Sequence, residues 1–303
     1  MHSVKILLYH GVRNNRNSGI ENYSNKHLLK IDFQKQMRFL KKNCNLISMS
    51  EIPKIINSDL KKTYFAVTFD DGFKNNYDNA AEILDFYKIP TTFYISTAYI
   101  GKIKMFWVDE LEDIFNNNIK NNIIIRLDKK INFDTSDKEK KIIALNIIKN
   151  YCKNSSISKK NSIVNFLKRK FNFITKKSIK NSNNYYSMSW KQVKALGANK
   201  YFTIGGHSHN HEVLSMLPEE RMFNEIDKCI SILKNKLKKN IMHFSYPEGL
   251  KNHFNYTIIN YLKDKGILVC PSAINGVNFK NENLFKLKRI MVGMNKIQFP
   301  FNI

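Results

Sequence analysis

The sequence predicts an α/β protein built on a parallel sheet or barrel, and three observations carry this prediction. Short apolar runs rich in Val, Ile, Phe and Tyr recur along the chain. Segments with helical periodicity lie between these runs, which is typical of parallel strands joined by helices. With 303 residues, 43% of them hydrophobic, the chain can bury a substantial core without disulfides.

Seven of the apolar runs have the length and composition of buried strands. They span residues 4–10, 64–69, 91–95, 201–206, 242–246, 266–270 and 285–290. Helical periodicity is clearest at residues 33–42, 77–87, 218–237 and 255–263. The third of these helices starts with Pro218, and proline is tolerated in the first turn of a helix.

The alternation of strands and helices stops at residues 101–188, where helix-like stretches follow one another. We therefore expect one barrel domain over residues 1–303 with a helical insertion at 101–188. Residues 140–180 carry twelve Lys or Arg and no acidic residue. A solvated helix face explains this bias. So does a basic lid that recognises phosphate on an activated sugar or lipid carrier, or that rests on anionic lipid.

The formal net charge of +25 raises nucleic acids, anionic membranes and acidic polymers as partners. Lys, Asn and Ile are frequent throughout the chain, and no RNP, zinc-finger or arginine-rich signature accompanies the charge, so we expect no nucleic-acid partner. The four cysteines form no C-x-x-C pair and are expected to be free thiols in a reducing compartment.

The sequence favours a cytoplasmic protein. The apolar run at residues 4–9 is too short for the core of a signal peptide, and no uninterrupted run of about 18 apolar residues is present. Contact with the inner face of the membrane stays open at this point, as does the oligomeric state.

The first chemical motif is Thr-Phe-Asp-Asp-Gly at residues 68–72, at the carboxyl end of a predicted strand. Two adjacent acids directly after an apolar strand are unfavourable unless they meet a cation or a ligand. Gly72 allows the chain to turn sharply behind Asp70 and Asp71. Asp-Asp-Gly is also ordinary turn chemistry, so a structural role is the alternative.

The second motif is Gly-Gly-His-Ser-His-Asn-His at residues 205–211, after another predicted strand. His207 and His211 are four residues apart, so in a helical turn both imidazoles project to the same side and can bind one metal ion. His209 would point elsewhere in that geometry. A solvated histidine-rich loop is the alternative.

One carboxylate and two imidazoles together make a three-ligand site with open positions for water and substrate, as in catalytic zinc sites. The second Asp can then take a proton from the attacking water. Two His and one carboxylate are also the ligand set of non-haem iron oxygenases, which stay an alternative on these residues alone.

Three motifs in order resemble those of the polysaccharide deacetylases, the NodB-homology or carbohydrate esterase family 4 group. They are Thr-Phe-Asp-Asp-Gly at 68–72, His-Ser-x-x-His at 207–211 and Tyr-Pro-Glu-Gly at 246–249. Tyr-His-Gly-Val at 9–12 and Leu-Lys-Arg-Ile at 287–290 are similar to a branch associated with surface-polysaccharide synthesis. The resemblance implies a distorted (β/α)7 barrel, and it does not cover the insertion.

The resemblance also implies roles for individual residues. Asp70 would be the general base, and Asp71, His207 and His211 would bind a divalent metal ion, with zinc expected. No Leu-x-His occurs near the C-terminus, where many members of the family carry the general acid. In the branch that this chain resembles, the histidine after the first strand can take that part, which makes His10 the candidate.

Two positions depart from the family pattern. Ser245 stands where members often have an Arg, two places before Pro247, so the group that orients the base must come from elsewhere or be absent. Glu248 stands where an aromatic residue is frequent. Ser208 is expected to hold its loop by hydrogen bonding.

The leading hypothesis is a metal-dependent hydrolase that removes an acetyl group from a sugar, with N-acetyl favoured over O-acetyl. The sugar would belong to a cell-surface polysaccharide or to its lipid-linked or nucleotide-linked precursor. A catalytically inactive barrel that binds sugar is the second hypothesis. The adjacent second Asp and the order of the motifs argue against the iron oxygenase.

Overall fold

The computed structural model describes residues 2–14 and 19–294, and the chain forms two compact units. The barrel unit comprises Met1–Asn14, Asn25–Lys102 and Ser187–Ile303, and the second unit comprises Asn15–Ser24 and Ile103–Tyr186. The second unit thus overlaps the expected insertion at 101–188 but also includes a short segment near the N-terminus. No helix in the described residues has the length and apolar character needed to span a membrane.

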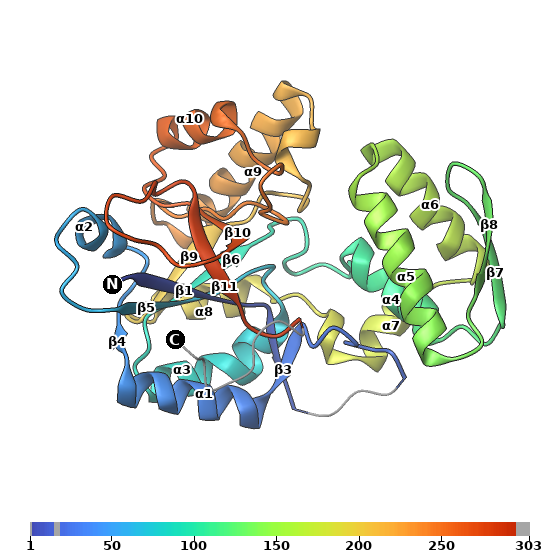
Figure 1. Ribbon diagram of the computed structural model, residues 1–303, viewed down its shortest axis with the longest axis horizontal. Helices are drawn as coiled ribbons and strands as arrows, with labels where there is room; N and C mark the ends of the chain where they lie inside the picture. The colour runs from blue at the N-terminus through green and yellow to red at the C-terminus, as the bar shows by residue number, and fades with distance from the viewer. Residues whose placement is uncertain (1, 15–18, 295–303) are drawn as a thin grey trace. The chain divides into compact units, whose positions relative to one another are not determined.

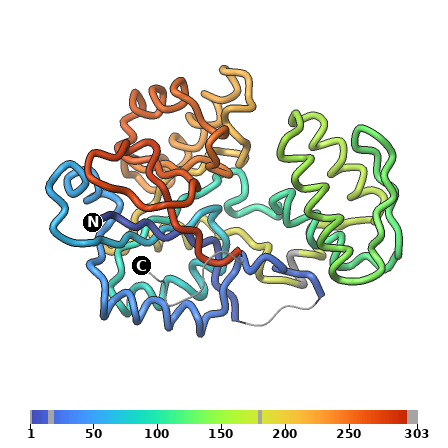
Figure 2. Tube along the Cα trace, viewed as in Figure 1, coloured from blue at the N-terminus to red at the C-terminus, as the bar shows by residue number. Residues whose placement is uncertain are grey.

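The barrel unit is built on a parallel sheet in the order β10-β11-β1-β5-β6-β9, with the short strand β4 beside β5. The first strand therefore pairs with the last, as Figure 2 shows. The bounds are β1 Val4–Tyr9, β4 Asn45–Leu46, β5 Tyr64–Phe69, β6 Thr91–Ile95, β9 Phe202–Gly206, β10 Pro271–Asn275 and β11 Leu287–Met291. A separate parallel pair joins β2 (Gly11–Arg13) to β3 (His27–Leu29).

The barrel closes through hydrogen bonds rather than through a regular seventh strand. The strand expected at 242–246 is present only as two isolated parallel bridges, Gly206↔Phe244 and His243↔Val269. The N–H of Gly206 donates to the carbonyl of His243 at 2.9 Å, and the N–H of Phe244 donates to Val269 at 3.2 Å. The strand expected at 266–270 begins at Pro271 instead, and proline is tolerated as the first residue of a strand because it has no N–H to donate.

Helices surround the strands, with α1 and α3 on one side and α9 and α10 on the other (Figure 1). On α9, Met222, Ile226, Cys229 and Leu233 are buried, the spacing of one apolar helix face. The helix expected at 77–87 is divided into a π-helix and a short α-helix. The bounds are α1 Lys30–Asn43, α2 Ile52–Ile56, η1 Asn76–Ala81, α3 Glu82–Phe86, α8 Trp190–Ala198, η3 Leu214–Met216, α9 Glu219–Leu237 and α10 Tyr256–Asp264.

Aromatic packing fixes the carboxyl ends of β1 and β5. Tyr9 stacks on Phe69 at 5.3 Å, and Phe33 of α1 meets both rings edge-on. Tyr9 and Phe69 therefore face the helical layer. Because side chains alternate along an extended chain, the residues that follow them, His10 and Asp70, face the opposite side.

Two glycines at the end of β9 allow close packing beneath the second motif. A Cβ on Gly205 would lie 2.6 Å from the ring of Tyr94 and 2.9 Å from the carbonyl of His243. We expect Gly205→Ala to lower the free energy of unfolding by about 1–3 kcal/mol, as overpacking does. Denaturant unfolding measures this, with Gly197→Ala as the control. Gly197 lies in α8, where alanine is the better helix former, so a control as unstable as Gly205→Ala would contradict the explanation.

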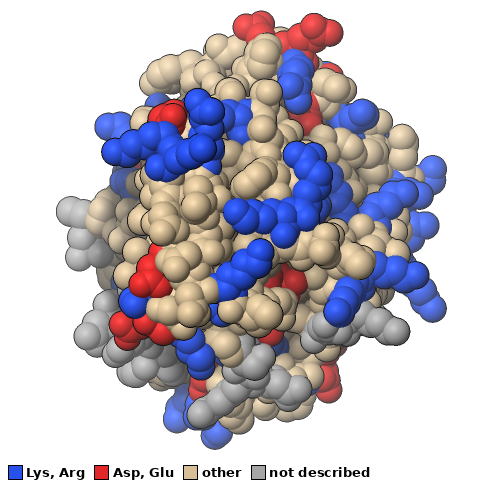
Figure 3. All heavy atoms as spheres, turned by 90° about the vertical axis from the view of Figure 1, so that its right-hand side faces the viewer, with Lys and Arg blue, Asp and Glu red and all other residues tan. Residues whose placement is uncertain are grey.

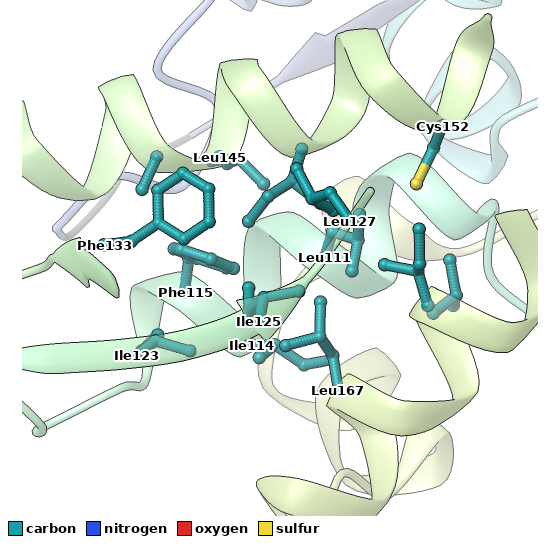
Figure 4. Packing of buried hydrophobic residues seen from close by; sticks show 14 of the residues in the cluster. Leu111, Ile114, Phe115, Ile123, Ile125, Leu127, Phe133, Leu145, Cys152 and Leu167 are labelled. Carbon is teal, nitrogen blue, oxygen red and sulfur yellow. The ribbon is translucent and has the colours of Figure 1, made fainter. Parts of the chain in front are cut away.

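The second unit has its own core, formed by α4, the hairpin β7–β8, α5 and α6 (Figure 4). The hairpin was not expected, because residues 101–188 read as helical. The strand pattern in the sequence is short: Ile123 and Ile125 are buried and Ile124 is exposed, an alternation over only a few residues. The bounds are α4 Trp107–Asn116, β7 Asn122–Arg126, β8 Lys130–Asp134, α5 Lys138–Lys153, α6 Ile157–Lys170, α7 Thr175–Asn181 and η2 Asn183–Tyr185.

Candidate active site

Asp70 and Asp71 follow β5 directly and lie in a tight turn. The N–H of Gly72 donates to the carbonyl of Asp70 at 3.0 Å, across Asp71, whose φ is 76°. A positive φ at the centre of such a three-residue turn is rare and strained for a residue other than glycine. Both carboxylates are buried, at 4% and 7% exposure. The turn lets two consecutive acids reach different partners.

His207 and His211 lie in an irregular loop, so the expected helical turn is wrong. The loop bends through left-handed backbone at Ser208 (φ 55°) and at His211 (φ 57°). The two imidazoles nevertheless converge, with ring centres 4.9 Å apart. The Ser208 hydroxyl is buried and has no hydrogen-bond partner among the described residues, so Ser208 helps to hold the loop only through its backbone carbonyl, which accepts from the N–H of Thr97 at 3.4 Å.

Side chains of neighbouring segments also hold this loop. Thr97 shares a hydrogen bond of 2.8 Å with Nδ1 of His209. Glu225 of α9 accepts hydrogen bonds from the backbone N–H of Asn210 at 2.6 Å and from its side-chain amide at 2.7 Å. The ring of His209 is thus used to hold the loop, through its hydrogen bond with Thr97.

Asp71, His207 and His211 form a group that could hold a metal ion. Among the described residues, one ligand atom from each lies within 4.8 Å of the others. Nε2 of His211 lies 3.2 Å from Oδ1 of Asp71, and Nε2 of His207 lies 3.6 Å from the same oxygen. Nδ1 of His207 lies 2.8 Å from the carbonyl oxygen of Ser245, which can only accept. Nδ1 therefore carries the proton and leaves the Nε2 lone pair for a metal ion, so the residues fit a divalent cation.

Burial and charge act differently on the three side chains of the group. Burial lowers the pKa of His207 to about 4, so this imidazole is neutral at pH 7. Burial opposes the charge on Asp71, but the hydrogen bond and charge of His211, together with the charges of His10 and His207, outweigh burial and lower the pKa of Asp71. The same contact raises the pKa of His211 against the opposing effect of burial.

Asp70 is paired with Arg289 of β11, a residue to which the sequence analysis gave no role. Nη1 of Arg289 donates to Oδ1 of Asp70 at 2.8 Å, and Nη2 donates to Oδ2 at 2.7 Å. Arg289 is 1% exposed, and its Nε donates to the carbonyl of Ser272 at 2.6 Å. Burial would raise the pKa of Asp70, but the guanidinium, together with the charges of His207 and His10, outweighs burial and lowers it. The Asp70 carboxylate is therefore held ionised and in one orientation.

Arg289 also contacts Ser245, where the family pattern often has its arginine. Nη2 of Arg289 donates to Oγ of Ser245 at 2.9 Å. The small serine leaves room for a guanidinium that arrives from a different strand. One signal in the sequence pointed to Arg289: an arginine inside a predicted buried strand is rare unless it is paired.

His10 follows β1 on the same end of the barrel as the two acids. Tyr9 is in register with Phe69, and the N–H of Asp70 donates to the carbonyl of Tyr9 at 3.0 Å. Nδ1 of His10 is buried and has no hydrogen-bond partner among the described residues. Burial lowers the pKa of His10, and the charges of Asp71 and Asp70 oppose that effect.

The third motif forms a rigid loop beside the group. Tyr246 stacks on Phe254 at 4.3 Å, and its hydroxyl donates to the carbonyl of Phe285 at 3.0 Å. Gly249 has a φ of 55°, and a Cβ there would lie 2.6 Å from the backbone nitrogen of Ala273. Glu248 lies near enough for its charge to help raise the pKa of His211.

Comparisons with known proteins agree with this geometry. A polysaccharide deacetylase family model matches residues 57–122 and 161–269, more than half of the chain, and no curated protein matches the sequence. IcaB from Ammonifex degensii resembles the fold with a TM-score of 0.62 at 16% identity, covering 96% of this chain and 92% of that one.

Two further structures are similar. The Streptococcus pyogenes deacetylase PplD, solved with acetate, gives a TM-score of 0.60 at 16% identity over 97% of this chain and 93% of that one. The BpsB deacetylase domain from Bordetella bronchiseptica gives 0.56 at 17% identity over 96% of both chains. These structures confirm the predicted (β/α)7 barrel. The chain belongs to the polysaccharide deacetylase family, whose members are hydrolases that act on carbon–nitrogen bonds.

Proposed function

We propose that the chain removes an N-acetyl group from a sugar of a cell-surface polysaccharide or of its lipid-linked or nucleotide-linked precursor. The observation that carries the proposal is the convergence of Asp71, His207 and His211 beside a second carboxylate, Asp70, that a buried arginine holds. An inactive sugar-binding barrel is not favoured, because each position that hydrolysis needs is filled by a suitable side chain.

We propose Asp71, His207 and His211 as the ligands of a divalent cation, with zinc as the expected ion. The support is the donor set and the tautomer that Ser245 imposes on His207. When bound there, a divalent cation lowers the pKa of water and polarises the acyl carbonyl.

Asp70 is proposed to accept the proton of the attacking water. Its Oδ2 lies 3.9 Å from Nε2 of His207, so the carboxylate borders the ligand group. Arg289 orients both carboxylate oxygens and keeps them ionised, which a general base requires. The buried surroundings exclude bulk water from the pair.

His10 is proposed as the general acid that protonates the leaving amine. An amide nitrogen leaves poorly unless it gains a proton, whereas an activated ester needs no such help. We expect His10→Ala to retain bound metal and to lower the rate of N-deacetylation by about 10²- to 10⁴-fold. The same variant should hydrolyse an acetate ester with a good leaving group at close to the wild-type rate. Equal losses on both substrates would remove His10 from this role.

Acetate release tests the proposed function directly. Purified protein, reconstituted with zinc, is incubated with oligomers of N-acetylated amino sugars and with nucleotide-linked N-acetylated sugars. We expect release with at least one of them and none from His207→Ala. Release from O-acetylated sugars alone would contradict the N-acetyl assignment, and equal release by His207→Ala would contradict the site.

We further propose a cytoplasmic location and one deacetylase domain over residues 1–303 with residues 101–188 as an insertion. The support for the location is that Cys44, Cys152, Cys229 and Cys270 are all free. Fractionation of cells that express the tagged chain checks the location. Recovery of the chain in the extracellular or cell-surface fraction would contradict it.

A further inference from the structure

The second unit keeps much of its negative charge inside and its positive charge outside. Helix α4 buries four acidic residues, Asp109, Glu110, Glu112 and Asp113. Two exposed acids are neutralised by ion pairs: Asp128 with Lys159 at 2.6 Å and Asp134 with Lys140 at 2.8 Å. Figure 3 views the molecule from the side of β7 and β8, and many more Lys and Arg than Asp and Glu side chains are visible on that face.

The exposed face of the hairpin carries two unneutralised charges directly opposite each other. Arg126 of β7 pairs in register with Lys130 of β8, and both side chains are exposed. The structure shows no ion pair for either among the described residues. Like charges at opposed positions of a hairpin destabilise it, so this pair is unfavourable unless an anion binds there.

Helix α6 extends the same surface. Nζ of Lys170 donates to the carbonyl of Ile124 at 3.1 Å, which places the end of α6 beside β7. Nζ of Lys170 also lies 5.4 Å from the ring centre of Phe166, and Arg169 is exposed. We call this surface the basic face, and it consists of Ile124, Arg126, Lys130, Phe166, Arg169 and Lys170.

The basic face combines cations with exposed apolar side chains. Ile124 is 55% exposed and Phe166 is 40% exposed, among four positive charges. Lipid phosphates can receive the cations, while the apolar side chains enter the boundary between headgroups and acyl chains. A nucleic acid would instead favour aromatic rings for stacking, and the one ring of this face lies against Lys170.

We propose that the basic face docks the second unit onto an anionic lipid surface. This proposal is independent of the deacetylase activity, because it is measured as binding. A single partner, the lipid surface, then explains both the unneutralised pair of Arg126 and Lys130 and the exposure of Ile124 and Phe166.

Sedimentation of the full chain with lipid vesicles tests the proposal. Vesicles of phosphatidylcholine alone are compared with vesicles that also contain phosphatidylglycerol. We expect binding only to the second kind, weakened by salt. The combined variant Arg126→Gln, Lys130→Gln, Arg169→Gln and Lys170→Gln should bind about 600-fold more weakly, because each of the four basic residues near an anionic surface adds about fivefold in affinity.

A matched variant separates a specific face from net charge. Lys41→Gln, Lys42→Gln, Lys191→Gln and Lys228→Gln remove the same charge from exposed positions of the barrel unit. This control should bind vesicles nearly as tightly as the wild type. Equal losses in the two variants would overturn the proposal, as would equal binding to neutral vesicles.

Two further measurements complete the test. Ile124→Gln with Phe166→Gln should reduce the binding that persists at high salt, and unchanged binding would remove the apolar part of the face. Binding to a DNA duplex without binding to anionic vesicles would overturn the proposal in favour of a nucleic-acid surface. Thermal melting of each variant checks that it is folded.

Discussion

Replacing Arg289 by methionine is expected to lower the free energy of unfolding by about 3–5 kcal/mol, because the change leaves a buried carboxylate without its cation. Arg289 and Asp70 are joined by two charge-assisted hydrogen bonds in a site that excludes water. Methionine keeps much of the length of arginine, so lost packing is a small part of the effect. Denaturant unfolding measures the change, and acetate release should fall with it.

A double-mutant cycle isolates the pair. Adding Asp70→Asn to Arg289→Met should recover much of the stability, because no buried charge is then left unpaired, while turnover stays lost. Arg221→Met, at an exposed position of α9, is the control and should change the free energy of unfolding by about 0.5 kcal/mol or less. An Arg289→Met protein as stable as the wild type would show that the pairing of Arg289 with Asp70 does not stabilise the fold.

Asp70→Asn is expected to lower turnover by about 10²- to 10⁴-fold and to leave metal binding intact. Asparagine keeps an oxygen that can accept from Arg289 but is far too weak a base to take a proton from water. Asp70 is outside the group of Asp71, His207 and His211, so the proposed ligands are unchanged. Acetate release and the metal content of the purified variant measure the two effects.

The matched control for this variant is Asp113→Asn in the second unit. Asp113 is also a buried aspartate, with a hydrogen bond from Ser178 at 2.5 Å, but it lies in α4 and has no part in the proposed chemistry. It should leave turnover unchanged. Wild-type turnover in Asp70→Asn would show that another group acts as the base.

The sequence predicted that the acids and histidines of the candidate site lie close together, for a physical reason. Polar side chains directly after apolar strands are unfavourable without a ligand, and the ends of parallel strands meet at one end of a barrel. The spacing of His207 and His211 predicted their convergence but not its cause. A separation of four residues fits a helical turn, and it also fits a loop bent by left-handed residues such as Ser208.

Other features depend on contacts that local patterns do not contain. Arg289 meets Asp70 across 219 residues of sequence, and only the folded sheet places β11 next to β1, whose other neighbour is β5. The segment at 242–246 has the composition of a strand but makes only isolated bridges. The hairpin β7–β8 alternates over too few residues to stand out from the helices around it.

The most direct test of the proposed catalytic site is the amount of divalent metal bound per chain after reconstitution with zinc, in the wild type and in His211→Ala. His209→Gln serves as the control, because its ring bonds to Thr97 in the same loop. The proposed site predicts about one zinc ion per chain in the wild type and in His209→Gln, and none in His211→Ala. Equal zinc in all three proteins, or none in the wild type, would contradict the proposed metal site.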